Sequence, residues 1–162
     1  MPLECRAACK DDLPRIVGFP RDPMELYFFM PTARFPLTLD VLEEMVAARQ
    51  APTVIMADGD VAGFADLYGC EFGNVCRIGN VVISPECRGR GAATALVRHM
   101  IGLAFEDFDA RRVELACFNN NLAGLLLYPK LGFRPFEIES RVGPSGERLA
   151  LIQFRLYREG EV

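Results

Sequence analysis

The sequence predicts one α/β domain of the α+β kind, in which a mixed, mostly antiparallel, twisted sheet of about seven strands has helices on both faces. Three observations support this fold class. The 162 residues are 51% hydrophobic and show no linker or break in composition, so we expect residues 1–162 to form a single domain. Short strand-like apolar runs alternate with amphipathic helical stretches. Glycine-containing turns join neighbouring strand-like runs at Asp58-Gly59-Asp60 and at Gly143-Pro144-Ser145-Gly146.

Alternating or continuous apolar runs mark the strands in chain order. They are expected at Leu3–Ala8, Thr53–Ala57, Val61–Leu67, Val75–Ser84, Arg112–Phe118, Phe133–Arg141 and Arg148–Tyr157. A further turn, Phe72-Gly73-Asn74, separates the third and fourth of these runs.

Helices are expected in the intervals between these strands. Asp11 or Asp12 caps a short helix through Val17, and Thr38 caps an amphipathic helix. The prolines of Pro20–Thr38 exclude one long helix there, so this segment is predicted as a short helix at Pro23–Phe29 followed by an irregular loop. Two later helices are expected, one ending near Asp107 with Ala93, Leu96, Val97, Met100 and Ala104 facing inward, and one at Leu122–Leu127.

Charge and composition exclude several classes of protein. The net charge of −4 with scattered Lys and Arg argues against a nucleic-acid partner. No apolar run approaches the roughly 20 residues of a membrane span, and the N-terminus lacks a signal-peptide core, so we expect a cytoplasmic protein without a membrane partner. The six cysteines form no C-x-x-C pair and there is one histidine, which favours reduced structural thiols and no metal site.

The stretch Val81–Leu96 predicts a phosphate-binding loop between a strand and a helix. Gly89 and Gly91 lead directly into the helix, whose first N–H groups lie at the positive end of the helix dipole. Arg88 and Arg90 add charge for the same anion. The stretch lacks the Gly-Lys pair of a P-loop, and Thr94 stands where a dinucleotide-binding fingerprint has its third glycine.

Two motifs in the chain resemble those of the GCN5-related N-acetyltransferase (GNAT) family. Residues Arg88–Ala93 match its Arg/Gln-x-x-Gly-x-Gly/Ala motif. Asn121, followed by Tyr128 and then by Gly132-Phe133, looks like the family's Asn-to-Tyr helix and its Gly-Phe ending. The proline-broken aromatic segment is similar to that of a bacterial subgroup known mostly from uncharacterised members. The resemblance extends over the order of elements and implies a single GNAT-like domain.

The resemblance implies a site for acetyl-coenzyme A as co-substrate, with no metal. The backbone N–H groups of Gly89, Arg90, Gly91, Ala92 and Ala93, with the side chains of Arg88 and Arg90, would hold the pyrophosphate. The pantetheine arm would pair with Val81, Val82 and Ile83 like an extra strand. Asn121 would bind the same arm, and Tyr128 would face the sulfur and protonate the leaving thiolate.

An N–H of Val82 or Ile83 is expected to stabilise the oxyanion. The group that accepts the proton of the amine is less well specified by the sequence. The strand Val75–Ile83 contains no Asp, Glu or His, although many family members place a glutamate there. A water relay to Asp66 or Glu71 is one hypothesis, and solvated surface carboxylates are the other interpretation of both. His99 is expected at the surface or at the boundary of the core.

The acceptor is expected to be a primary amine, on a small aminated metabolite or on a lysine or peptide. In the family the segment corresponding to Pro20–Thr38 walls the acceptor cleft. Its Asp22 and Glu25 favour a cation, whereas Arg34 favours a carboxylate, and its aromatic residues Phe28, Phe29 and Phe35 are equally consistent with a plain core. The competing functional hypothesis is a catalytically inactive coenzyme A-binding sensor or partner module. A homodimer is compatible with either function.

Overall fold

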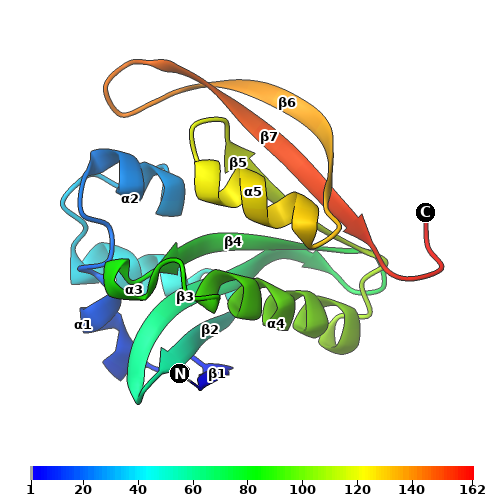
Figure 1. Cartoon of the computed structure of the whole chain (residues 1–162), viewed down its shortest axis with the longest axis horizontal. Helices are drawn as coiled ribbons and strands as arrows, with labels where there is room; N and C mark the ends of the chain where they lie inside the picture. The colour runs from blue at the N-terminus through cyan, green and yellow to red at the C-terminus, as the bar shows by residue number, and fades with distance from the viewer. Residues whose placement is uncertain (1) are drawn as a thin grey trace.

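A computed structural model, which describes residues 2–162, shows a sheet of seven strands in the order β1-β2-β3-β4-β5-β7-β6 (Figure 1). The strands are β1 Leu3–Ala7, β2 Gln50–Ala57, β3 Asp60–Glu71, β4 Val75–Ile83, β5 Arg112–Phe118, β6 Arg134–Val142 and β7 Arg148–Tyr157. The helices are α1 Leu13–Ile16, α2 Pro23–Phe29, α3 Leu39–Ala47, α4 Ala92–Asp107 and α5 Leu122–Lys130, with 3-10 turns η1 Lys10–Asp12 and η2 Pro85–Cys87. The predicted fold class is confirmed.

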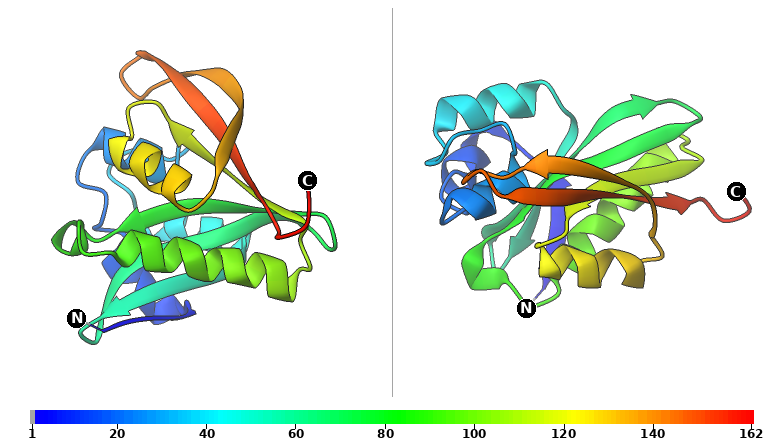
Figure 2. Two further views of the ribbon diagram at one scale, coloured as in Figure 1. Left: turned by 45° about the vertical axis from the view of Figure 1, so that its right-hand side comes forward. Right: turned by 90° about the horizontal axis from the view of Figure 1, so that it is seen from above.

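The sheet is split between β4 and β5. These strands pair in parallel, whereas the other neighbouring pairs are antiparallel, and their register covers only Val75–Arg77 against Arg112–Glu114. Beyond these residues β5, β7 and β6 turn away from β4, as two views of the ribbon show (Figures 1 and 2). The far half of β4 therefore has a strand neighbour on one side only, which is β3.

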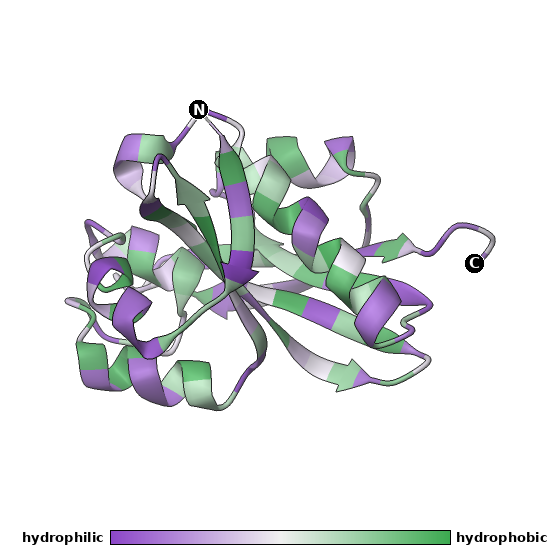
Figure 3. Ribbon diagram, turned by 90° about the horizontal axis from the view of Figure 1, so that it is seen from below, coloured by the Kyte–Doolittle hydropathy of each residue, from purple (hydrophilic) through white to green (hydrophobic). Residues whose placement is uncertain are grey.

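Two hydrophobic cores lie on opposite faces of the sheet. On one face, α4 and α5 pack against the strands through a cluster that includes Leu96, Met100 and Phe133. On the other face, α1, α2 and α3 pack through a cluster that includes Ile16, Phe29 and Leu42. The ribbon coloured by hydropathy shows hydrophobic and hydrophilic bands alternating along the helices, as expected for helices with one buried side (Figure 3). Within residues 2–162, no helix combines the length and the apolar character needed to cross a membrane.

The first helical segment begins with the turn η1, and of the two predicted caps Asp12 stands at the N-cap position of α1. Its carboxylate makes no cap hydrogen bond to α1 and instead accepts one from the Cys9 N–H, at 2.8 Å, at the start of η1. Asp12 also pairs with Arg6 at 2.8 Å. Hydrogen bonds from Arg6 and Cys9 outweigh burial and lower the pKa of Asp12 to about 2. The caps Asp22 of α2 and Thr38 of α3 accept from the N–H groups of Glu25 and Val41.

Candidate active site

Tyr128 is fixed by the way α5 ends. The sequence predicted an end at Leu127, but the helix continues through Pro129 to Lys130. Proline removes one N–H, and the last turn is instead closed by bonds from Gly132 N to Pro129 O and from Phe133 N to Tyr128 O, each 3.1 Å. Gly132 has a φ of 99°, which suits glycine. This is a Schellman motif, and it holds the Tyr128 backbone in a defined place.

Gly124, which sequence reasoning missed, makes room for the Tyr128 ring. A Cβ at position 124 would lie 2.7 Å from the Cys117 Sγ and 3.0 Å from the tyrosine ring. The Gly124 N–H also takes part in the N-cap of α5, because it donates a hydrogen bond to the Oδ1 of Asn121 at 3.2 Å. The only available signal was a glycine inside the predicted Asn-to-Tyr helix. The short segment from Asn121 to Tyr128 therefore forms one packed unit against Cys117.

The glycine loop presents a row of N–H groups to solvent. Gly89 and Gly91 have φ values of 75° and 85°, and a Cβ on either would meet no atom within 4 Å. Gly91 is the N-cap of α4, and the first helical bond runs from Ala95 N to Gly91 O at 3.1 Å. The N–H groups of Ala92 and Ala93 therefore have no acceptor within the helix. Open space, free donors and a helix dipole together suit a pyrophosphate.

The outer part of β4 offers a second row of backbone groups. The Ser84 N–H donates to Ala62 O of β3 at 2.7 Å. Backbone N–H and C=O groups along an antiparallel strand point alternately to its two sides. Those of Val82 therefore also point to β3, while those of Val81 and Ile83 point toward the split. Of the two oxyanion donors considered from the sequence, Ile83 is the one directed into the split.

These features surround a cavity of about 420 Å³, which we call the loop groove. Every predicted site residue except Arg90 lines it, from Val81 on β4 to Tyr128 on α5. Arg88 lines the groove but its guanidinium is committed to Glu25 of α2, at 3.0 Å, rather than free for a ligand. Burial raises the pKa of Glu25, but hydrogen bonds from Arg88 and Arg21 outweigh it and lower that pKa to about 2. This ion pair ties α2 to the glycine loop.

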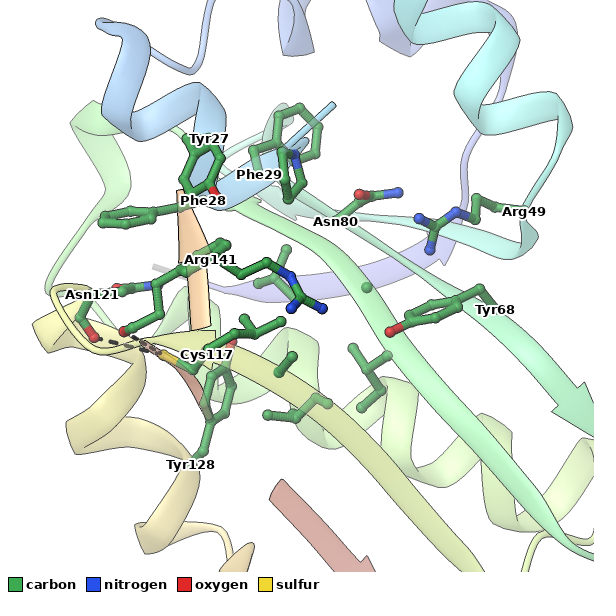
Figure 4. A pocket seen from close by; sticks show the side chains of 18 residues that line it. Tyr27, Phe28, Phe29, Arg49, Tyr68, Asn80, Cys117, Asn121, Tyr128 and Arg141 are labelled. Carbon is green, nitrogen blue, oxygen red and sulfur yellow. Dashed lines mark hydrogen bonds between the residues drawn. The ribbon is translucent and has the colours of Figure 1, made fainter. Parts of the chain in front are cut away.

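A second cavity of about 330 Å³, the aromatic cavity, opens on the other side of the split (Figure 4). Tyr27 and Phe28 of α2 pack on Phe118 of β5, with ring centroids 4.6 and 6.2 Å apart. The Tyr27 hydroxyl donates to Val142 O at 2.9 Å, which joins α2 to the end of β6. The aromatic segment therefore forms one wall of this cavity.

Of Phe28, Phe29 and Phe35, which the sequence could equally have placed in the hydrophobic core, only one is a fully buried residue. Phe29 is buried, Phe28 is half-buried between the two cavities, and Phe35 is 41% exposed. The cavities share Phe28, Phe29, Val81, Asn121 and Tyr128. In Figure 4 the ring of Tyr128 rises from α5 with its hydroxyl directed into the aromatic cavity. Burial, followed by the nearby Cys117, raises the pKa of Tyr128, so the hydroxyl keeps its proton.

Asp66 is not a surface carboxylate. Its side chain has no solvent exposure, and it accepts hydrogen bonds from Asn80 at 2.8 Å and from Arg49 at 3.3 Å. Burial raises its pKa to about 7, against the opposing effects of Asn80 and Arg49. Asn80 lies at an irregularity of β4, with a φ of 50°, and lines the aromatic cavity with Arg49. Asp66 therefore sits behind the cavity wall.

Glu71 and His99, the other two residues considered as candidates from the sequence, have clear positions in the fold. Glu71 is exposed at the end of β3, as the surface interpretation expected, and His99 is half-buried on α4, at the boundary of the core. The six cysteines are free thiols. Arg49, Asn80 and Arg141, which line the aromatic cavity, carried no recognisable signal in the sequence.

A glycine loop at a helix N-terminus suits a phosphate group, and an open strand edge can pair with an extended ligand. The sequence model of the Acetyltransferase (GNAT) family matches residues 20–133. This match covers more than half of the chain, so the chain belongs to the GNAT family, as its motifs predicted. It is thus a member of a family of acetyltransferases.

Known proteins agree with this assignment. A stretch of 58 residues is 38% identical to the uncharacterized N-acetyltransferase YobR of Bacillus subtilis. This stretch makes up 36% of this chain and 23% of YobR. The chain therefore spans about a quarter of the length of this curated relative. The crystal structure of an N-acetyltransferase from Staphylococcus aureus Mu50 superposes with a TM-score of 0.76 at 22% identity, over 97% of this chain and 99% of the other.

A structure of spermidine N-acetyltransferase from Vibrio cholerae, in complex with coenzyme A and spermine, gives a TM-score of 0.82 at 18% identity, over 97% of this chain and 96% of the other. At such identities the likeness concerns the fold.

Proposed function

We propose that this chain is an acetyl-coenzyme A-dependent N-acetyltransferase that acetylates a primary amine by direct attack on the thioester. The observation that carries this proposal is the position of Tyr128, which lines both the loop groove and the aromatic cavity. A donor bound in one and an acceptor bound in the other meet at this side chain. The family assignment supports the same reaction.

The loop groove fits coenzyme A. The free N–H groups from Gly89 to Ala93 suit the pyrophosphate, and a Cβ at Gly89 or Gly91 would intrude on the open space in front of them. The outward-facing backbone of Val81 and Ile83 suits the amides of the pantetheine arm, which would pair there like a strand. The Nδ2 of Asn121 adds a donor beside the same arm, because only its Oδ1 is used in the helix cap.

The co-substrate supplies an activated acetyl thioester, and the chain supplies three functions around it. The N–H of Ile83 is directed where an oxyanion needs a donor. Tyr128 remains protonated because burial raises its pKa, so it can give a proton to a leaving thiolate. The rings of Phe28 and Phe29 give the point where the two cavities meet an apolar wall.

Within residues 2–162, no carboxylate lines the aromatic cavity. The charged side chains that line the aromatic cavity in the described chain are Arg49 and Arg141. An amine with a pKa of about 10.4 is neutral in roughly 1 of 2,500 molecules at pH 7, which costs about 4.6 kcal/mol. Nearby guanidinium groups lower the pKa of an incoming ammonium and so reduce this cost. We infer that the amine loses its proton to solvent before attack.

The missing base is also the one observation that favours an inactive coenzyme A-binding module. Incubation with acetyl-coenzyme A and a panel of primary amines, followed by assay of free thiol, separates the two functions. An enzyme releases thiol in proportion to acetylated amine. Coenzyme A binding without thiol release for every amine would favour the module.

A further inference from the structure

The charged side chains that line the aromatic cavity in the described chain are cationic. Its lining within the described chain includes two arginines, Arg49 and Arg141, and no acidic residue. The acidic residues that the sequence offered for binding a cation lie elsewhere. Asp22 caps α2, and Glu25 pairs with Arg88 and Arg21 at the loop groove. The cavity is therefore suited to an anionic group on the acceptor rather than to a cationic one.

Arg49 is held in place by the surrounding strands. It follows α3, donates through Nη1 to the buried Asp66, and stacks on the Tyr68 ring with its Cζ 4.4 Å from the centroid. Gly79 on β4 leaves the space for both groups, since a Cβ there would lie 2.7 Å from the Arg49 Nη1 and 2.8 Å from the Tyr68 ring. The guanidinium is thus preorganised, and its donors beyond Nη1 are free for a ligand.

Arg141 reaches the cavity from the opposite side. It lies on β6, where its Nη1 donates to Ser140 O and its Nη2 to Glu139. Figure 4 shows its guanidinium extending into the middle of the cavity, toward the side from which Arg49 and Tyr68 enter. The carboxylate partners of the two arginines, Asp66 and Glu139, are not part of the cavity lining. Guanidinium groups facing a common space match the planar, multi-acceptor shape of a carboxylate.

We propose that the acceptor is a small amino acid with an apolar or aromatic side chain, whose carboxylate is bound by Arg49 and Arg141. This inference rests on the proposed acetyltransferase function and names its substrate class. The rings of Tyr27, Phe28 and Phe118 receive the side chain, and Tyr128 marks the end of the cavity where the amine meets the thioester. A volume of about 330 Å³ accommodates such a molecule.

The charge also accounts for the absence of a base in the wall. A cationic polyamine would bring further positive charge next to two guanidinium groups, which is unfavourable in a partly enclosed site. An amino acid neutralises one of them and leaves its own ammonium under the influence of the other, which favours the neutral, nucleophilic amine.

Matched amines test this proposal. L-Phenylalanine and L-leucine differ from phenethylamine and isoamylamine by the carboxylate alone, and spermidine represents the polycations. Initial rates of thiol release give kcat/KM for each amine with the wild-type protein, calculated on the concentration of the neutral amine so that differences in amine pKa do not enter the comparison. We expect the amino acids to exceed their decarboxylated partners by at least about tenfold, because charge-assisted hydrogen bonds are lost. Equal kcat/KM within each pair, or a preference for spermidine, would overturn the proposal.

Substitutions of the two arginines test whether they cause the preference for the amino acid in each pair. Arg49→Gln and Arg141→Gln should each remove most of the preference within a pair, while Arg49→Lys, which keeps the charge, should retain part of it. Arg98→Gln is the matched control, because Arg98 is exposed on α4 and does not line the cavity. A preference unchanged in both cavity variants would contradict the assignment.

Binding measurements keep this test separate from the test of the enzyme itself. Thiol release with other amines but not with amino acids would refute the substrate class and leave the acetyltransferase function intact. If no amine gives thiol release, the acetyltransferase function fails, and calorimetry still decides on the site. N-Acetyl-L-phenylalanine should bind the wild-type protein at least about tenfold more tightly than N-acetylphenethylamine, and Arg141→Gln should remove that difference. Equal or absent binding of the two compounds refutes the carboxylate site.

Discussion

The backbone N–H of Phe133 donates to the carbonyl of Tyr128 at 3.1 Å, and the two rings meet edge to face with centroids 6.1 Å apart. One motif thus ends α5, buries Phe133 and fixes the tyrosine between two cavities. The Gly132-Phe133 pair has a local structural role, which is to position Tyr128 by both its backbone and its ring.

Replacing Tyr128 with Phe should lower turnover more than coenzyme affinity. Loss of a general acid typically reduces kcat by about 10²-fold or more, whereas the ring that packs on Phe133 and Phe154 is kept. Steady-state kinetics and calorimetry with coenzyme A measure the two effects separately. Tyr157→Phe, which removes a hydroxyl bonded to Arg155, is the control and should change neither. An equal loss of kcat and affinity would show that the hydroxyl is structural.

Gly91→Glu should abolish coenzyme A binding and leave the fold intact. The new carboxylate would occupy the space in front of the free N–H groups of α4 and repel the pyrophosphate. Gly146→Glu is a matched control, because Gly146 has a φ of 84° against 85° at Gly91, with equally open space, in the turn between β6 and β7. Calorimetry should show a loss of at least about 100-fold for Gly91→Glu alone. Similar affinities for the two variants would argue against the loop as the phosphate site.

Gly124→Ala should impair turnover by displacing Tyr128, the proposed general acid. The added Cβ would lie 2.7 Å from the Cys117 Sγ and 3.0 Å from the Tyr128 ring, so one of them must move. We expect destabilisation of about 1–3 kcal/mol by overpacking, seen as a lower Tm, together with reduced kcat. The double variant with Cys117→Ala should recover part of both.

Gly102→Ala on α4 is the control for Gly124→Ala. A Cβ there has no atom within 4 Å, so the change should stabilise by about 0.5–1 kcal/mol through helix propensity. Wild-type kcat in Gly124→Ala would be incompatible with the proposed packing.

The stability of the protein should fall between about pH 4 and pH 7 because of Asp66. Its folded pKa is raised from 3.8 to about 7, so the stabilisation is complete below the unfolded pKa and is lost as pH rises through the folded one. A change of roughly 2–4 kcal/mol is expected from that shift. Asp12 and Glu25 have lowered pKa values, so their contributions change only at more acidic pH.

Urea denaturation at several pH values measures this dependence. Asp66→Asn, which cannot ionise, should show a flatter profile across the same interval. If the wild-type and variant profiles run parallel, the buried carboxyl is not the source.

The rate should rise with pH below the pKa of the amine. Because no carboxylate of the described chain lines the aromatic cavity, only the neutral amine reacts, and kcat/KM should increase about tenfold per pH unit. A plateau near neutral pH in the profile of kcat/KM against pH would instead indicate a general base in the protein.

Local motifs were sufficient to predict most of the residues that line the loop groove. The glycine loop, Asn121 and Tyr128 belong to short segments whose backbone geometry follows from nearby residues, and the structure brings all three to the loop groove. The end of α5 was missed because a proline normally stops a helix, whereas here the Schellman bonds from Gly132 and Phe133 close the last turn.

The aromatic cavity could not be predicted in the same way. Arg49 comes from a turn, Asn80 from an irregularity in β4, and Arg141 from the distant strand β6, and only the tertiary fold brings them together. Asp66 looked like a solvated carboxylate because its partners, Arg49 and Asn80, lie 17 and 14 residues away in sequence. Pairings of this kind leave no periodic or local signal.

A crystal structure of the protein with coenzyme A would show directly whether the glycine loop and Tyr128 belong to one donor site. We expect the pyrophosphate within hydrogen-bond distance of the N–H groups between Gly89 and Ala93, the pantetheine arm along Val81 and Ile83, and the sulfur beside the Tyr128 hydroxyl. Electron density for the pyrophosphate away from the glycine loop, or a sulfur remote from Tyr128, would contradict this placement.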